Sequence, residues 1–99
     1  MASTNNLLLT SMNYFQWKPH MEDLLRSKGL YQITLGKEIE PTDADKKVKW
    51  ANRNDEANGL IKMSISHDLR FDLQSIDQPK EAWDKIESMF GKHTIIRAQ

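Results

Sequence analysis

Apolar residues recur three and four positions apart along three stretches of this chain, and each stretch contains one tryptophan: Trp17, Trp50 or Trp83. This spacing places the apolar side chains on one face of an α-helix. One large aromatic side chain per main helix is how a small helical domain fills its core with few bulky residues. We therefore expect an all-α fold, a small bundle of about five helices.

The first helix is expected in the run that follows Ser11. Either Ser11 or Asn13 can act as its N-cap, because both side chains can accept a hydrogen bond from an unpaired backbone N–H. Pro19 lacks a backbone N–H and clashes with the carbonyl four residues earlier. This predicts a kink over residues 15–18 or a helix that begins near residue 18.

Glycine and proline mark the ends of the other elements. Gly29 should end the first helix. Gln78 and Glu81 have the spacing of a capping box at the start of the last helix. The later expected elements are a helical turn over residues 30–35, a long helix from Thr42 or Asp43 to about Ser64, a short helix over residues 68–74, and a last helix from Pro79 to Gly91.

The 99 residues are enough for one domain with a single core. We divide them into a flexible or extended lead-in over residues 1–12, a helical domain over residues 13–91, and the truncated start of a further helix over residues 92–99. Because the pattern breaks off within that last helix, we expect the chain to be a fragment of something longer.

Charge and cysteine content restrict the classes of function. Lys plus Arg and Asp plus Glu each number 14, so the formal net charge is zero. A nucleic-acid-binding domain usually carries a basic excess, because phosphate neutralisation supplies much of its affinity. The zero net charge of this chain therefore argues against a nucleic-acid-binding domain. The absence of cysteine excludes disulfides, thiolate zinc sites and cysteine nucleophiles. With no apolar run long enough to span a membrane, we expect a soluble cytoplasmic chain without a membrane partner.

The sequence carries no catalytic or metal-binding pattern. His20, His67 and His93 are far apart and lack the spacing of metal ligands. Acidic pairs such as Glu22 and Asp23 fall on polar helix faces, where solvated pairing with basic neighbours is the expected role. The serines give no case for an activated nucleophile. We therefore expect no enzyme, no metal or cofactor, and no small-molecule substrate.

The large apolar side chains are expected to fill the core first and to leave some surface for self-association, since aromatic residues also dominate binding interfaces. The expected core anchors are Trp17, Met21, Leu24, Leu25, Trp50, Leu60, Ile61, Trp83, Ile86 and Phe90. The expected self-assembly surface consists of Leu7, Leu8, Leu9, Tyr14, Phe15 and Tyr31.

The order of several short motifs resembles the Gag polypeptide of copia-type LTR retrotransposons. That family's pattern is a leucine-rich lead-in, Asn-Tyr-x-x-Trp, a methionine, a leucine pair and Gly-Leu-aromatic. Here it falls on Leu7 to Leu9, Asn13, Tyr14, Trp17, Met21, Leu24, Leu25, Gly29, Leu30 and Tyr31. The later motifs fall on Trp50, Ala57, Leu60, Ile61, the run from Gln78 to Asp84, Met89 and Phe90. The departures are Pro19 and the Gln-Pro pair at 78–79, where the family often has Thr-Ala.

The resemblance implies the N-terminal, capsid-like region of a Gag protein, with a fold similar to a retroviral capsid N-terminal domain. Such proteins self-assemble in the cytoplasm into virus-like particles around the element's RNA. We therefore expect a homo-oligomer or particle, with RNA bound only through sequence downstream of this chain. The alternative is a domesticated or fused Gag-like domain that acts as a protein–protein interaction adaptor. An enzyme built on distant acids such as Glu22 and Asp84 is a third possibility that no motif supports.

Overall fold

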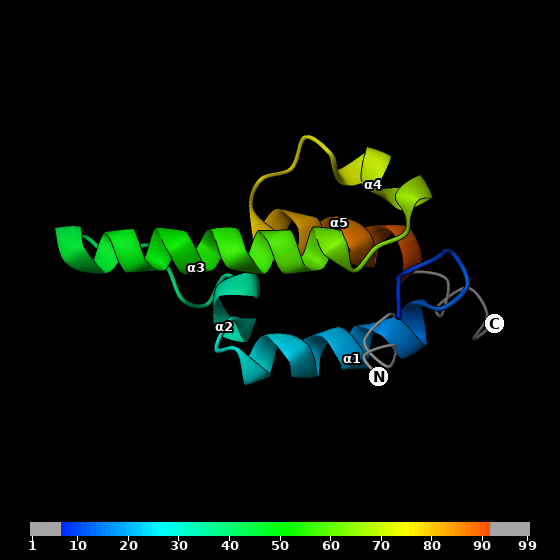
Figure 1. The fold of residues 1–99 in the computed structure, drawn as a ribbon, viewed down its shortest axis with the longest axis horizontal. Helices are drawn as coiled ribbons and strands as arrows, with labels where there is room; N and C mark the ends of the chain where they lie inside the picture. Colours follow the sequence, from blue (N-terminus) through cyan, green and yellow to red (C-terminus); the bar gives the residue numbers. More distant parts are fainter. Residues whose placement is uncertain (1–6, 92–99) are drawn as a thin grey trace.

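The computed structural model describes residues 7–91 of the chain. These residues form the helices α1 (Tyr14–Ser27), α2 (Tyr31–Thr34), α3 (Ala44–Met63), α4 (His67–Leu73) and α5 (Pro79–Phe90). Helices α3 and α5 pack side by side, α2 joins α1 to both of them, and α4 lies on the outside of the domain (Figure 1). The all-α prediction is confirmed. The further helix expected over residues 92–99 lies outside the described residues.

Helix α1 begins at Tyr14, so a start near residue 18 is wrong. Pro19 lies inside the helix and cannot donate a hydrogen bond to the Phe15 carbonyl, which costs about 3 kcal/mol in a helix interior. Both residues are on the exposed side, where water can hydrate that carbonyl. Burial of Tyr14 and Trp17 in the turn before Pro19 offsets this cost. The position of the buried face therefore sets the start of the helix.

Asn13 is the N-cap residue of α1, but its side chain makes no hydrogen bond to the helix. Instead, Asn13 Oδ1 accepts from the Thr10 N–H at 2.8 Å, and Asn13 Nδ2 donates to the Leu8 carbonyl at 2.8 Å. The expected capping bond is replaced by two bonds that hold the preceding extended segment against the start of α1.

That extended segment pairs with the junction between α3 and α4. The Leu9 N–H donates to the Ser64 carbonyl at 2.8 Å, and the Ser66 N–H donates to the Leu9 carbonyl at 2.9 Å. The result is an isolated parallel bridge between Leu9 and Ile65. Both leucine and isoleucine are buried there, so the bridge adds apolar surface to the core as well as two hydrogen bonds.

Two glycines in the left-handed region turn the chain on either side of α2. Gly29 has a φ of 71° and Gly36 a φ of 78°, values that L side chains rarely adopt. The long helix α3 then begins as the sequence predicts, because Asp43 Oδ2 accepts a hydrogen bond from the Lys46 N–H at 3.0 Å.

Helix α5 begins at Pro79, which is buried at the first helical position. The capping box expected there is wrong, because the Gln78 side chain makes no bond to the helix. Gln78 Oε1 accepts a hydrogen bond from Asn54 Nδ2 at 2.9 Å instead. The residue therefore ties the start of α5 to the middle of α3.

Two tryptophans meet at the centre of the core. The rings of Trp17 and Trp83 have centroids 5.6 Å apart, and Trp17 Nε1 donates to the Ser64 carbonyl at 3.0 Å. The Tyr14 ring lies 6.1 Å from that of Phe90 and extends the cluster to the end of α5. The buried apolar residues are Leu9, Tyr14, Trp17, Met21, Leu25, Leu30, Ile33, Ala57, Ile61, Ile65, Leu73, Ala82, Trp83, Ile86 and Phe90.

Replacing Trp83 by alanine should lower the free energy of unfolding by about 3–5 kcal/mol, because it removes a buried aromatic side chain and leaves a cavity beside Trp17. Urea denaturation followed by far-ultraviolet circular dichroism measures the change. Phe71→Ala is the matched control, since that ring is exposed and its loss should change stability by no more than about 0.5 kcal/mol. An unchanged free energy for Trp83→Ala contradicts its place in the core.

Candidate interaction surface

The expected core anchors divide into two groups. Trp17, Met21, Leu25, Ile61, Trp83, Ile86 and Phe90 are buried, whereas Leu24, Trp50 and Leu60 are partly buried and pack against the core. The indole of Trp50 donates from Nε1 to the Glu38 carbonyl at 3.1 Å. This tryptophan therefore fixes the connector before α3 as well as covering the core.

Two residues of the expected self-assembly surface lie in the core instead. Leu9 has no exposed area, because its backbone bridge to Ile65 holds the side chain inside. Tyr14 is 6% exposed, because it lies three residues before Trp17 and shares its inward face. Burial, together with the nearby charge of Glu87, raises the pKa of Tyr14 to about 12. The expectation that Leu9 and Tyr14 face a partner is wrong.

Three apolar side chains at the start of the domain remain exposed. Leu8, Met12 and Phe15 are 43%, 90% and 51% exposed, and we call them the lead-in patch. The edge contact of Phe15 with the Tyr14 ring, at 5.1 Å between centroids, and the Asn13 bond to the Leu8 carbonyl hold its two ends in place. The pattern of leucines and aromatics missed Met12. Leu7 is partly buried and packs against the core.

Tyr31, the last residue of the expected surface, is engaged with its own chain. Its hydroxyl donates to Glu22 Oε2 at 3.0 Å, and the Arg26 guanidinium lies 4.3 Å from the centre of its ring. Partial burial is the main cause that raises the pKa of Tyr31, and the hydrogen bond to Glu22 raises it further. Its face beside Gly29 and Gln32 borders a shallow depression of about 260 Å³. Contact of Tyr31 with a partner stays a prediction.

Sequence reasoning also missed the role of Arg53. Its guanidinium donates to both carboxylate oxygens of Glu38, one at 2.9 Å, and to the carbonyl of Gly29. This side chain therefore joins α3 to the connector and to the turn after α1. The hydrogen bonds from Arg53 lower the pKa of Glu38. The two partners are far apart in the sequence, so helical spacing gives no signal for the pair.

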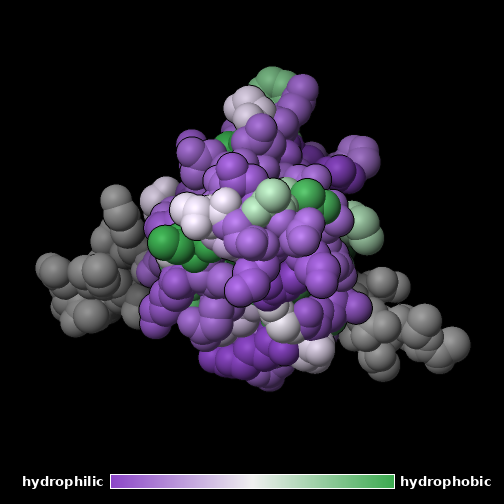
Figure 2. Space-filling view, turned by 90° about the vertical axis from the view of Figure 1, so that its left-hand side faces the viewer, coloured by the Kyte–Doolittle hydropathy of each residue, from purple (hydrophilic) through white to green (hydrophobic). Residues whose placement is uncertain are grey.

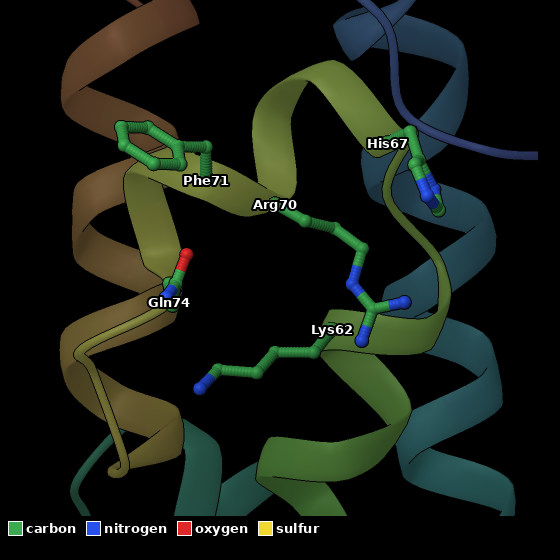
Figure 3. Close-up of a pocket in the computed structure, with 5 residues that line it drawn as sticks. All are labelled: Lys62, His67, Arg70, Phe71 and Gln74. Atoms are coloured by element: carbon green, nitrogen blue, oxygen red, sulfur yellow. The ribbon is translucent and has the colours of Figure 1, made fainter.

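A second exposed surface lies where α3 ends and α4 begins. It surrounds a depression of about 440 Å³ lined by Lys62, His67, Arg70, Phe71 and Gln74. In Figure 3 the Lys62 and Arg70 side chains extend across this depression, while His67 and Phe71 lie toward opposite ends of α4. All charged or titratable lining residues are basic, and Phe71 is 78% exposed. We call this surface the α4 face.

The end of the domain at the start of α3 is mainly hydrophilic (Figure 2). The view toward the N-terminal end of α3 shows hydrophobic side chains only as small, separate groups (Figure 2). Among residues 7–91, no cluster of His, Asp and Glu side chains could hold a metal ion. None of the helices described is long and apolar enough to cross a membrane.

Comparison with known proteins gives one relevant similarity. The chain is 27% identical over 79 residues to the retrovirus-related Pol polyprotein from transposon TNT 1-94 of Nicotiana tabacum. The match covers 80% of this chain but only 6% of that polyprotein. No protein-family model matches the chain, and no solved structure matches it. The similarity relates the chain to retrotransposon proteins and leaves its part in such an element to be proposed.

Replacing Glu38 by glutamine should lower the free energy of unfolding at neutral pH by up to about 1 kcal/mol, because the ion pair with Arg53 is partly exposed. The pKa of Glu38 is lowered in the folded state, so the pair stabilises the fold above the ordinary value of 4.5. The difference between the parent and the variant should disappear as the pH falls through the lowered pKa.

Urea denaturation of both proteins at neutral pH and at about pH 3 measures this difference. Glu40→Gln is the matched control, because Glu40 lies 3.7 Å from Lys47 in an exposed pair and its loss should change stability by less than about 0.5 kcal/mol. Equal effects of the two substitutions at neutral pH would show that Arg53 does not fix the connector through Glu38.

Proposed function

We propose that this chain is a structural Gag fragment of a copia-type retrotransposon, and that its copies self-assemble in the cytoplasm into virus-like particles. In this proposal the domain acts as a capsid component and catalyses no reaction. The element's RNA is packaged through sequence downstream of these residues.

Two findings support this assignment. The chain is similar to the polyprotein of a tobacco transposon over 79 residues. Its described residues form an all-helical domain, as the motif order from Leu7 to Phe90 leads us to expect of a Gag protein. The polyprotein is much longer than this chain, so the similarity by itself supports only a retrotransposon protein. The motif order is what supports Gag in particular.

The observation that carries the self-assembly proposal is the lead-in patch. The core already contains Leu9, Tyr14 and Trp17, so the exposed Leu8, Met12 and Phe15 add apolar surface beyond what the core uses. Exposed apolar groups at a fixed position on a small domain mark a contact surface. A weak contact of this kind is sufficient in a particle, because many copies repeat it under the same symmetry.

Light scattering coupled to size exclusion tests the proposal over protein concentrations from about 10 μM to about 1 mM, the range of weak association. The mass of the parent should rise with concentration. The double substitution Leu8→Ser and Phe15→Ser should weaken association about tenfold, because it removes two of the three exposed apolar side chains of the patch.

Val48→Ser is the matched control, because Val48 is an exposed apolar residue of α3 away from the lead-in patch. It should leave the concentration dependence unchanged. A parent that stays monomeric at every concentration contradicts self-assembly by this chain and favours the adaptor function. Circular dichroism of each variant verifies that the helices are intact.

A further inference from the structure

The short helix α4 has an outward face with Phe71 at its centre and an inward face with leucines. Because successive residues are about 100° apart around a helix, Phe71 points directly away from Leu69 and Leu73, which face the domain. The exposure of these residues agrees: Phe71 is open to solvent, Leu69 is partly buried and Leu73 is buried. Phe71 therefore stands at the centre of the outward face of α4.

Opposite charges flank this phenylalanine. On the same helical geometry, His67 and Arg70 lie on one side of Phe71, and Asp68 and Asp72 lie on the other. All four side chains are exposed, and none forms an ion pair with another residue among residues 7–91. The basic side continues to Lys62, whose side chain extends into the depression beside Arg70 (Figure 3).

We propose that the α4 face binds the same face of a second copy of this chain. The two α4 helices lie side by side and point in the same direction, related by a two-fold axis parallel to them. Phe71 packs on Phe71 of the second copy, and Arg70 lies level with the space between Asp68 and Asp72 of the second copy. This inference rests on the proposed self-assembly and adds a defined contact to it.

The direction of the helices follows from the arrangement of charge. In a parallel pair related by this axis, the basic flank of each helix meets the acidic flank of the other, as at the flanking positions of a parallel coiled coil. In an antiparallel pair, basic flank meets basic flank and acidic flank meets acidic flank. Like charges in contact oppose association. Only the parallel pair gives both copies of Arg70 an acidic partner.

Charge also decides between a second copy and a nucleic acid. Exposed Phe71 beside Lys62 and Arg70 offers a ring for stacking and cations for phosphate. Asp68 and Asp72, however, border the same ring and repel phosphate, and the chain has no net positive charge. A surface with both signs arranged around an apolar centre is complementary to itself.

The contact is two-fold symmetric and closes on itself, so α4 alone joins two copies and no more. A pair of seven-residue helices buries less than the roughly 1,200 Å² of a stable interface. We therefore expect weak dimers in solution. Larger particles need the lead-in patch as a second, different contact, because a closed two-fold contact cannot by itself propagate.

Charge exchange between the two flanks tests the proposal by sedimentation equilibrium of the whole chain. Arg70→Asp and Asp72→Arg should each weaken association about tenfold, because each brings like charges together at both symmetric positions. An equimolar mixture of the two variants should associate more strongly than either variant alone. In the mixed pair, the introduced aspartate of one variant meets the introduced arginine of the other, and the unchanged Asp72 and Arg70 meet on the opposite flank.

Phe71→Ser should also weaken association, because it removes the apolar centre of the contact. Its matched control is Ile39→Ser, a change at another exposed apolar residue outside α4. Lys85→Asp and Asp55→Arg, exposed charge changes on other helices, should leave association unchanged.

A parent that associates no more strongly than the α4 variants overturns the α4 contact and leaves self-assembly standing. A parent that is monomeric at every concentration overturns both. If a fluorescent uridine oligonucleotide binds the parent and binds Asp72→Arg more tightly, while Asp72→Arg does not weaken self-association, the α4 face is a nucleic-acid site and the proposal fails.

Discussion

The carbonyl oxygen of Ser64 is the point at which the domain is joined together. It accepts hydrogen bonds from the Leu9 N–H and from Trp17 Nε1, so one atom connects the extended segment, α1 and the junction between α3 and α4. The Trp17 ring in turn packs on Trp83 of α5. A carbonyl shielded from water costs free energy when it lacks a partner, and the two partners of this partly buried carbonyl come from different elements. The fold therefore depends on α1 and the extended segment reaching Ser64 together.

Sequence reasoning placed the features that depend on neighbouring residues. The cap at Asp43, the proline start of α5 and the turn at Gly29 are local, and each lies where the pattern predicts it. It failed where a side chain has a distant partner. Asn13 and Gln78 were expected to cap their own helices, yet they bond to the extended segment and to α3. Capping propensity reflects only the hydrogen bonds that a side chain can make to its own helix, and a hydrogen bond to a distant residue can replace them.

The candidate surface shows the same division between local and distant information. Of the residues expected to face a partner, Leu8 and Phe15 are exposed. Leu9 was misplaced because its burial depends on residues 64–66, which no nearby pattern reveals. Phe71 was overlooked, although its position opposite Leu69 and Leu73 could have been found from helical spacing. A neutral net charge also concealed the separation of charge around that residue, because opposite flanks cancel in the sum.

The parallel bridge at Leu9 and the ring contact between Tyr14 and Phe90 determine where the chain enters and leaves this domain. Both lie at the same pole, so the first and last described residues emerge together (Figure 1). The opposite pole is the N-terminal end of α3. Residues 7 and 91 therefore lie on one side of the domain. The described chain thus returns to the side from which it starts, and the N-terminal end of α3 is the part of the domain that lies away from both of its ends.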